Sequence, residues 1–399
     1  MERAGRAGRT AALRAGALCL LGALLTGCGV VGAAKAPAQA IEVTPRDGVS
    51  GVGAHDRLRV SVPEGRLERV RVARTGGAAG RPLPGRVSSD GHTWEPTGTS
   101  RKLKLSSEYT VHVVARDRRG RRVARHTTFA TKVPDRHFIG FFTPEHRQTV
   151  GTAMILSIKF SRPIARRAAV ERAIRVTADP EARVAPHWFG RSRLDFRPRT
   201  YWKPGTRVTL DLRLRHVRAA RGVYGVQRKR VHFTVGRDQR SVVDARTHTM
   251  TVRRGGVVVN TVPVTAGSAE NPTYTGRMVI SQKFRVTRMN ASTVGFGGEY
   301  DIEDVPHAMR LTDSGTFLHG NYWASRSTFG TANVSHGCVG LRDRKGGDDN
   351  SPAGSFYHRS LIGDLVKVKG SGERTLGADN GLGGWNMSWR AWRAGSALN

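Results

Sequence analysis

The residues of this sequence that could carry covalent chemistry are a cysteine and two histidines. Residues 317–320 read Phe-Leu-His-Gly, fifteen residues follow from position 320 to 334, and residues 335–338 read Ser-His-Gly-Cys. A thiol is a poor nucleophile while protonated, and a neighbouring imidazole or positive field favours the thiolate. In an extended chain His336 would point to the same side as Cys338, whereas His319 must arrive on another strand, from which it can be aimed at the sulfur. A cysteine nucleophile with a histidine partner is one hypothesis for this segment.

Two other interpretations of the same residues stay open at this point. His319, His336 and Cys338 could bind zinc, although a structural zinc site needs four ligands and the chain has no CxxC pair. A buried structural cysteine beside hydrogen-bonded histidines is the second alternative. Gly337 favours catalysis, because a glycine lets the backbone turn sharply and aim the N–H groups of Gly337 and Cys338 at one point, as an oxyanion hole requires.

The first 28 residues indicate export. Arginines at positions 3, 6, 9 and 14 precede an apolar stretch over residues 15–25, which is too short for a membrane-spanning helix of about 20 residues. Residues 25–28, Leu-Thr-Gly-Cys, resemble a bacterial lipobox, in which the cysteine receives lipid; an ordinary signal peptide is the alternative. Cleavage there would remove Cys19 and block Cys28, leaving Cys338 as the one free thiol. We therefore expect an extracytoplasmic protein, lipid-anchored through Cys28 to the outer face of the bacterial cell membrane.

Length and charge limit what the chain can be. Its 399 residues allow two or three domains of about 100–200 residues, and 38% hydrophobic residues with 48 glycines suit a soluble β-rich chain. Residues 240–399 hold 19 Lys and Arg against 13 Asp and Glu, and so carry +6 of the net charge of +35, while residues 1–239 carry +29. The N-terminal part therefore predicts an anionic partner, such as an envelope polymer or membrane.

Nucleic acid, a cofactor and a metal ion are not expected. The chain has no helix-turn-helix pattern, zinc-finger spacing or aromatic RNA-binding signature. Residues 51–53, Gly-Val-Gly, are too short for a nucleotide-binding loop, and the acids at 348 and 349 lack calcium-loop spacing.

Residues 29–40 are predicted to form a flexible tether. From there to residue 237 the same pattern of short strands and turns occurs twice. Short alternating segments with turn signals, and no long helical period, are typical of β-sandwiches, and about 90–100 residues per copy is the size of an immunoglobulin-like module. We predict such modules at residues 41–134 and 135–237.

Residues 240–372 predict a mostly β domain with little helix. The Gly-Gly pair at 255–256 between alternating runs predicts a hairpin, and Ser351 followed by Pro352 predicts a helix that runs to about Leu361. Tryptophans at 385, 389 and 392 recur on one face of a short helix. We expect residues 373–399 to pack this face on the preceding domain.

The last region resembles the L,D-transpeptidases, cysteine enzymes that crosslink bacterial peptidoglycan. The histidine, the spacing and Ser-His-Gly-Cys carry the resemblance, which extends over most of residues 240–399. The actinobacterial branch often has two immunoglobulin-like modules behind a lipobox, which is the layout predicted above. Four further segments are similar to the family's opening hairpin, substrate-side turn, a Met-Asn-Ala-Ser-Thr stretch and Trp-rich tail: residues 243–254, 273–276, 289–293 and 381–395.

The resemblance implies Cys338 as nucleophile and His319 as general base. The carbonyl of the next residue would orient the imidazole, and here that residue is Gly320 where Ser is common. A carbonyl survives this change, so we expect function to survive it.

The resemblance also assigns the turn before the cysteine. The N–H groups of Gly337 and Cys338 would hold the oxyanion, His336 would shape the hydrogen bonds of the site, and Ser335 matches the Ser or Thr of the motif. The family often has Asn two residues after the cysteine. This chain has Gly340 there, so one polar contact is missing or supplied elsewhere.

Three residues are implied as substrate-binding: Tyr274, Met289 and Tyr300. The family's lid carries a Tyr about eighteen residues before the base. Here Tyr300 lies nineteen residues before His319, and the sequence of the lid differs from the family's. The acids at 301, 303 and 304 beside it could attract the cationic end of a diamino acid, although surface acids are usually solvated.

The resemblance predicts an acyltransferase that forms 3→3 crosslinks between stem peptides through a thioester on Cys338, and whose thiol a carbapenem would trap. Two alternatives remain. Water could resolve the same thioester, which would make the protein an L,D-carboxypeptidase that trims stems. A non-catalytic lipoprotein that grips the wall through its basic modules is the other, and Gly340 and the altered lid favour it.

Overall fold

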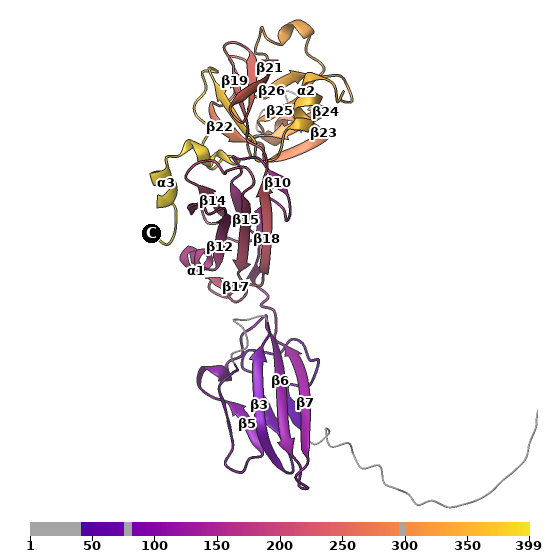
Figure 1. The fold of residues 1–399 in the computed structure, drawn as a ribbon, viewed down its shortest axis with the longest axis vertical. Helices are drawn as coiled ribbons and strands as arrows, with labels where there is room; N and C mark the ends of the chain where they lie inside the picture. The colour runs from indigo at the N-terminus through magenta and orange to yellow at the C-terminus, as the bar shows by residue number, and fades with distance from the viewer. Residues whose placement is uncertain (1–40, 76–81, 295–300) are drawn as a thin grey trace, which may run out of the picture.

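The structure, a computed structural model, describes residues 41–75, 82–294 and 301–399. Two β-sandwich modules and a third domain follow one another along an elongated molecule, and the C-terminal segment turns back beside the second module (Figure 1). The mainly β fold class is thereby confirmed. The export signal, Cys28, the tether and Tyr300 lie outside the described residues. Within these ranges no helix is both long and apolar enough to cross a membrane.

The first module packs a four-stranded sheet, in the order β1-β2-β5-β4, on a three-stranded sheet, β3-β6-β7. Every second residue of β6 is buried, which is the pattern of a strand with one face on the core. Tyr109 of β6 stacks on Phe129 of β7 with ring centroids 5.1 Å apart. The strands of the module are β1 (Glu42–Thr44), β2 (Arg59–Ser61), β3 (Arg66–Arg74), β4 (Gly85–Val87), β5 (Thr93–Pro96), β6 (Glu108–Arg116) and β7 (Arg122–Ala130).

The second module has two four-stranded sheets, β10-β18-β15-β12 and β13-β14-β11-β9, and a small sheet β16-β17-β8. Alternation again decides the faces: Val208, Leu210 and Leu212 of β15 point into the core. Its elements are β8 (His137–Phe138), β9 (Gly140–Thr143), β10 (Thr149–Val150), β11 (Leu156–Phe160), α1 (Arg167–Arg172), β12 (Ile174–Asp179), β13 (Val184–Phe189), β14 (Arg193–Pro198), β15 (Arg207–Arg213), β16 (Arg218–Ala220), β17 (Val223–Gly225) and β18 (Arg228–Val235).

The third domain is built on one nine-stranded sheet of described residues, in the order β22-β27-β19-β20-β21-β26-β25-β24-β23. The predicted hairpin joins β20 to β21, with positive φ at both Gly255 and Gly256. Its strands are β19 (Gln239–Asp244), β20 (Thr249–Arg254), β21 (Val257–Thr265), β22 (Gly276–Val279), β23 (Gln282–Asn290), β24 (Asp301–Arg310), β25 (Phe317–Asn321), β26 (Val339–Arg342) and β27 (Leu365–Lys369). Short 3-10 turns are η3 (Ala291–Val294), η4 (Arg326–Thr328) and η5 (Gly383–Asn386), and the helices are α2 (Pro352–Arg359) and α3 (Trp389–Ala394).

Helix α2 begins where the sequence predicts and ends two residues earlier than expected. Ser351 caps it, with its side chain accepting from Gly354 N at 2.9 Å, and Pro352 takes the first position. The helix stops at Arg359 because the Leu361 N–H donates instead to the Asp364 carboxylate at 2.8 Å.

The C-terminal segment packs mainly on the second module, where the sequence predicted packing on the third domain. Trp392 is fully buried; its indole N–H donates to Ala185 O at 2.9 Å and its ring stacks on His187. The Trp385 N–H donates to Ala153 O at 2.7 Å. A buried indole needs an acceptor for its N–H, and the second module supplies both. The segment forms η5 and α3 in place of one helix.

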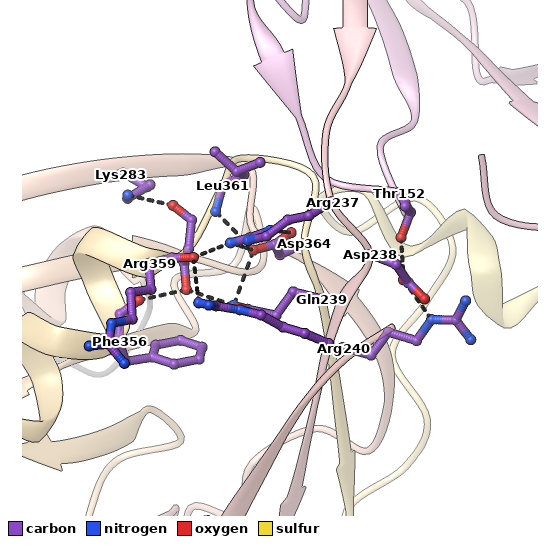
Figure 2. Close-up of polar contacts among 12 residues, drawn as sticks. Thr152, Arg237, Asp238, Gln239, Arg240, Lys283, Phe356, Arg359, Leu361 and Asp364 are labelled. Atoms are coloured by element: carbon purple, nitrogen blue, oxygen red, sulfur yellow. Dashed lines mark hydrogen bonds and ion pairs between the residues drawn. The ribbon is translucent and has the colours of Figure 1, made fainter. Parts of the chain in front are cut away.

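A polar junction joins the second module to the third domain (Figure 2). Asp364 is buried and accepts from both terminal nitrogens of Arg237 at 3.0 Å, and from Gln239 Nε2 at 3.2 Å. Burial raises the pKa of Asp364, and the hydrogen bonds from Arg237 counteract part of that rise. Gly151 approaches so closely that a Cβ there would lie 2.3 Å from Asp364 Oδ1. The backbone of the second module at Gly151 therefore contacts the Asp364 carboxylate of the third domain.

Removing the Arg237 guanidinium tests how much this junction contributes to the free energy of unfolding. We expect Arg237→Ala to lower the free energy of unfolding by about 2–3 kcal/mol, because a buried carboxylate loses its partner. The expected value lies below that for a fully buried pair because the Arg237 side chain is 30% exposed. Urea unfolding of the two docked domains measures it. Arg240→Ala is the control, since this side chain is 47% exposed and pairs with Asp238, so that less than about 1 kcal/mol is expected. Equal losses in the two variants would contradict the assignment.

Candidate active site

The parallel pairing of β25 with β26 brings His319 and Cys338 together. In this ladder Leu318 pairs with Val339 and His319 with Gly340. Cys338 immediately precedes β26, so it lies across from the start of β25, and the Phe317 N–H points at its sulfur with N and Sγ 3.3 Å apart. Residues two apart on a strand share a face, so the nucleophile and base candidates face the same side of the sheet.

A cavity of about 410 Å³ opens on that side. Five of the residues that the sequence singled out line it together: Met289, His319, Ser335, His336 and Cys338. The other lining residues are Ile302, Asn321, Trp323, Ala324, Thr328 and Val334. The cavity is therefore walled by aromatic and aliphatic groups with the thiol and imidazole inside.

The hydrogen bonding of His319 determines which ring nitrogen can act as a base. Its Nδ1 donates to Gly320 O at 2.9 Å, and its ring stacks on Trp323 at a 15° interplanar angle. Burial lowers the pKa of His319, while the bond to Gly320 and the charge of Asp343 oppose this shift. A lowered pKa keeps the ring neutral at pH 7, with the proton on Nδ1 and a lone pair on Nε2.

The Cys338 thiol is protonated at neutral pH. Burial raises its pKa to about 11, opposed by the Phe317 N–H, and its S–H donates to Gly315 O at 3.6 Å. The resting pair is therefore a neutral thiol beside a neutral imidazole. Attack by sulfur needs proton transfer to an imidazole as the substrate arrives.

Ser335 ties the turn that carries the cysteine. Its hydroxyl donates to Cys338 O at 2.6 Å and accepts from Gly337 N at 3.2 Å. Gly337 has φ +106°, which L side chains rarely adopt. A substrate oxygen at this turn would compete with Ser335 for the Gly337 N–H.

Of the three predicted substrate residues, Tyr274 is absent from the described lining of the thiol cavity. Its ring packs on the core of the third domain, with the Arg374 guanidinium 5.8 Å from the ring centre. Tyr300 lies outside the described residues. Asp301 is paired with Arg288, and Asp304 accepts from the Tyr322 hydroxyl.

Asn321 is a site residue that sequence reasoning missed. It is 3% exposed and lines the cavity, and its Oδ1 accepts from Trp323 N at 3.2 Å and Ala324 N at 2.9 Å. These bonds turn its Nδ2 toward Gly340, where a Cβ would lie only 3.2 Å from it. The Asn321 amide thus fills the space that an asparagine at position 340 would need. The signal was present as Gly340 itself, with an asparagine two residues after the base.

Both the N-terminal and the C-terminal parts of the chain are similar to known proteins. Residues 49–218 match a bacterial Ig domain and residues 238–368 an L,D-transpeptidase catalytic domain. The chain is similar to L,D-transpeptidase 2 of Mycobacterium tuberculosis, 32% identical over 354 residues that cover 88% of this chain and 83% of that protein. L,D-transpeptidase 5 of the same species is 29% identical, with 91% and 78% covered. A crystal structure of its L,D-transpeptidase 3, in complex with a faropenem-derived adduct, is 28% identical with a TM-score of 0.45, covering 57% of this chain and 97% of that one.

The raised pKa of Cys338 predicts its reactivity in the free protein. We expect alkylation by iodoacetamide to accelerate about tenfold per pH unit from pH 7 to beyond 9, because the thiolate fraction keeps rising toward a pKa of about 11. Residues 41–399 contain no other cysteine, so intact mass follows this thiol alone, and a short cysteine peptide provides the reference. A plateau below pH 9 would mean that an imidazole already holds the thiolate.

Proposed function

Because the chain belongs to the L,D-transpeptidase family, we propose that it forms 3→3 crosslinks between peptidoglycan stem peptides through a thioester on Cys338. One observation carries the proposal: Cys338 and His319 share a cavity, and the His319 Nδ1 bond to Gly320 leaves Nε2 as a base. The family acts on stem peptides, and the roles of these side chains are our inference.

The reaction starts from the neutral pair. As a tetrapeptide stem binds, the Cys338 thiol gives its proton to His319 Nε2, and the sulfur attacks the carbonyl of the third stem residue. The terminal D-amino acid leaves with the proton of the imidazolium, and a thioester remains. An amine from the third residue of a second stem then attacks the thioester and loses a proton to His319. The new amide is the crosslink, and the thiol is regenerated.

The oxyanion of each tetrahedral intermediate would lie at the turn before the cysteine. The Gly337 N–H is held by Ser335 at rest, and it can shift to a developing oxyanion because charge strengthens the hydrogen bond. His336 lines the same cavity and shapes this end of it.

An acidic cavity next to the thiol cavity suits the acceptor amine. It has a volume of about 440 Å³ and shares Ile302 and Trp323 with the thiol cavity. Its other lining residues are Asp301, Glu303, Asp304, Tyr322 and Lys345. Asp301 is already paired with Arg288, so Glu303 and Asp304 would be the carboxylates that attract the ammonium of a diamino-acid side chain toward the thioester.

We further propose that the enzyme acts outside the cytoplasm, anchored by lipid on Cys28, with its basic N-terminal modules bound to anionic envelope polymers. Residues 28–239, which remain after cleavage before Cys28, carry a net charge of +26, and this charge supports polymer binding. Mass spectrometry of membrane-associated protein tests the lipid. Retention of Cys338→Ala protein on isolated walls should weaken as ionic strength rises.

Intact mass tests the acyl-enzyme. We expect residues 41–399 to gain the mass of the acyl group from a disaccharide tetrapeptide, and that of a whole carbapenem, under reducing conditions. Cys338→Ala should gain neither. An adduct that persists in Cys338→Ala would move the nucleophile, and an unmodified wild type would refute the mechanism. Crosslinked dimers among the products favour transfer, whereas trimmed stems alone would indicate hydrolysis.

Because Asn321 and Gly340 are in contact, we predict that substitutions at the two positions have non-additive effects on kcat/KM. We expect Asn321→Ala to lower kcat/KM about tenfold, since an oriented amide donor is lost from the cavity. Gly340→Asn should also be impaired, because its Cβ would meet Asn321 Nδ2 at 3.2 Å and Thr265 Cγ2 at 2.9 Å. The double variant restores an amide and relieves one clash, so it should be more active than the product of the single effects. Strictly additive losses would show that the two positions act independently and would contradict this assignment.

A further inference from the structure

A second cluster of possible metal ligands is formed by side chains of β24, of the loop before α2 and of α2. His307 of β24 is 1% exposed; its Nδ1 is 2.7 Å from Asp343 Oδ2 and its Nε2 is 3.2 Å from Asp349 Oδ1. His358, in the last turn of α2, places its Nε2 2.9 Å from the same Asp349 oxygen. We propose that His307, Asp349 and His358 bind a divalent transition-metal ion, with Asp343 as the outer partner of His307.

The donor set is suited to such an ion. Two imidazole nitrogens and one carboxylate oxygen are the protein ligands of many three-ligand zinc sites, which leave a fourth position for water. Ligands about 2.0–2.1 Å from a tetrahedral ion lie roughly 3.3 Å from one another. The three ligand atoms lie within 4.8 Å of one another. Asp349 Oδ1 is 3.2 Å from His307 Nε2 and 2.9 Å from His358 Nε2, which is close to the separation expected around an ion.

The arrangement around His307 also suits a metal ligand. Its Nδ1 faces the buried Asp343 carboxylate, and its Nε2 faces the Asp349 oxygen that the His358 Nε2 also faces. An ion at this point would contact all three atoms. A carboxylate on the far nitrogen is the usual outer partner of a metal-bound histidine.

The backbone at His307 is unusual for its residue type. Its φ is +49°, in the left-handed region, although neighbours on the same strand keep the ladder, with Pro306 paired to Val286 and Ala308 to Phe284. A non-glycine residue holds such a conformation only where its surroundings favour it, often at functional sites. Here the conformation accompanies a ring with an acid at each nitrogen.

Charge around the cluster is compatible with a divalent ion. The formal charges of the Asp343 and Asp349 carboxylates would offset those of a dication. Arg285, 3.9 Å from the other Asp349 oxygen, is the nearby competitor; its side chain is 70% exposed and free to extend into water.

The ion would connect to the catalytic strand through Asp343. A Cβ at Gly320 would lie 2.2 Å from Asp343 Oδ2, so this carboxylate sits directly beneath the residue whose carbonyl orients His319. By holding His307 and the loop before α2, the ion would hold Asp343 in that position. The binding proposal itself does not depend on the proposed reaction.

Zinc titration of residues 41–399 tests the site. We would use the Cys338→Ala background, which removes the thiol as a competing ligand, and measure heat of binding after chelator treatment, with cobalt absorption as a second probe. One zinc per chain is expected at micromolar concentration or below. Asp349→Asn and His358→Gln should each weaken binding about tenfold or more. Both side chains are about half exposed, so the fold should persist, which circular dichroism checks.

The matched control is His126→Gln. His126 and His112 form an exposed histidine pair on the first module, with their Nδ1 atoms 3.1 Å apart, and this change should leave the affinity unaltered. Binding lost in His126→Gln and kept in Asp349→Asn would place the ion on the first module. Absence of zinc binding, or equal affinity in all variants, would overturn the proposal.

Discussion

The parallel pairing of β25 with β26 is the constraint on which the site depends. Parallel neighbours need a crossover connection, and here it leaves β25, passes through η4 and returns to the cysteine. Asn333 anchors the returning chain: its Nδ2 donates to Ala245 O at 2.8 Å and its Oδ1 accepts from Ala266 N at 2.9 Å. The Ser335 N–H then donates to Ala266 O at 3.0 Å. The turn that carries the thiol is therefore held by hydrogen bonds to Ala266, the residue that follows β21, before β26 begins.

Two glycines on these strands make room for polar side chains from elsewhere. Gly320 leaves space for Asp343, which raises the pKa of His319 against the effect of burial. Gly340 leaves space for the Asn321 amide. Both positions differ from the residues common in the family, and in both the missing side chain is replaced by a group from a neighbouring strand or loop. At Gly320 and Gly340 the polar group therefore comes from a different residue, Asp343 or Asn321, and the space is still occupied by a polar side chain.

Features with local causes could be predicted from the sequence. The Gly255-Gly256 hairpin, the Ser351 cap and the strand alternation act over a few residues, and the spacing of His319 and Cys338 resembles a known motif. Asn321, His307 and the destination of the tryptophans could not be predicted, because each depends on partners far along the chain. Nothing near position 307 in the sequence indicates an acid on each side of that ring.

The boundary between the second module and the third domain shows the limit of sequence-based division most clearly. Composition and turn signals place it near residue 237, and a new sheet does start at β19. The apolar core of the second module nevertheless includes Val279, Leu365 and Trp385 from beyond that boundary. Burial of apolar surface is roughly proportional to the area removed from water, so separating the two would expose part of one shared core as well as the Arg237–Asp364 pair. The second module and the third domain therefore share one apolar core, which also includes Trp188 of β13 and Trp392 of α3.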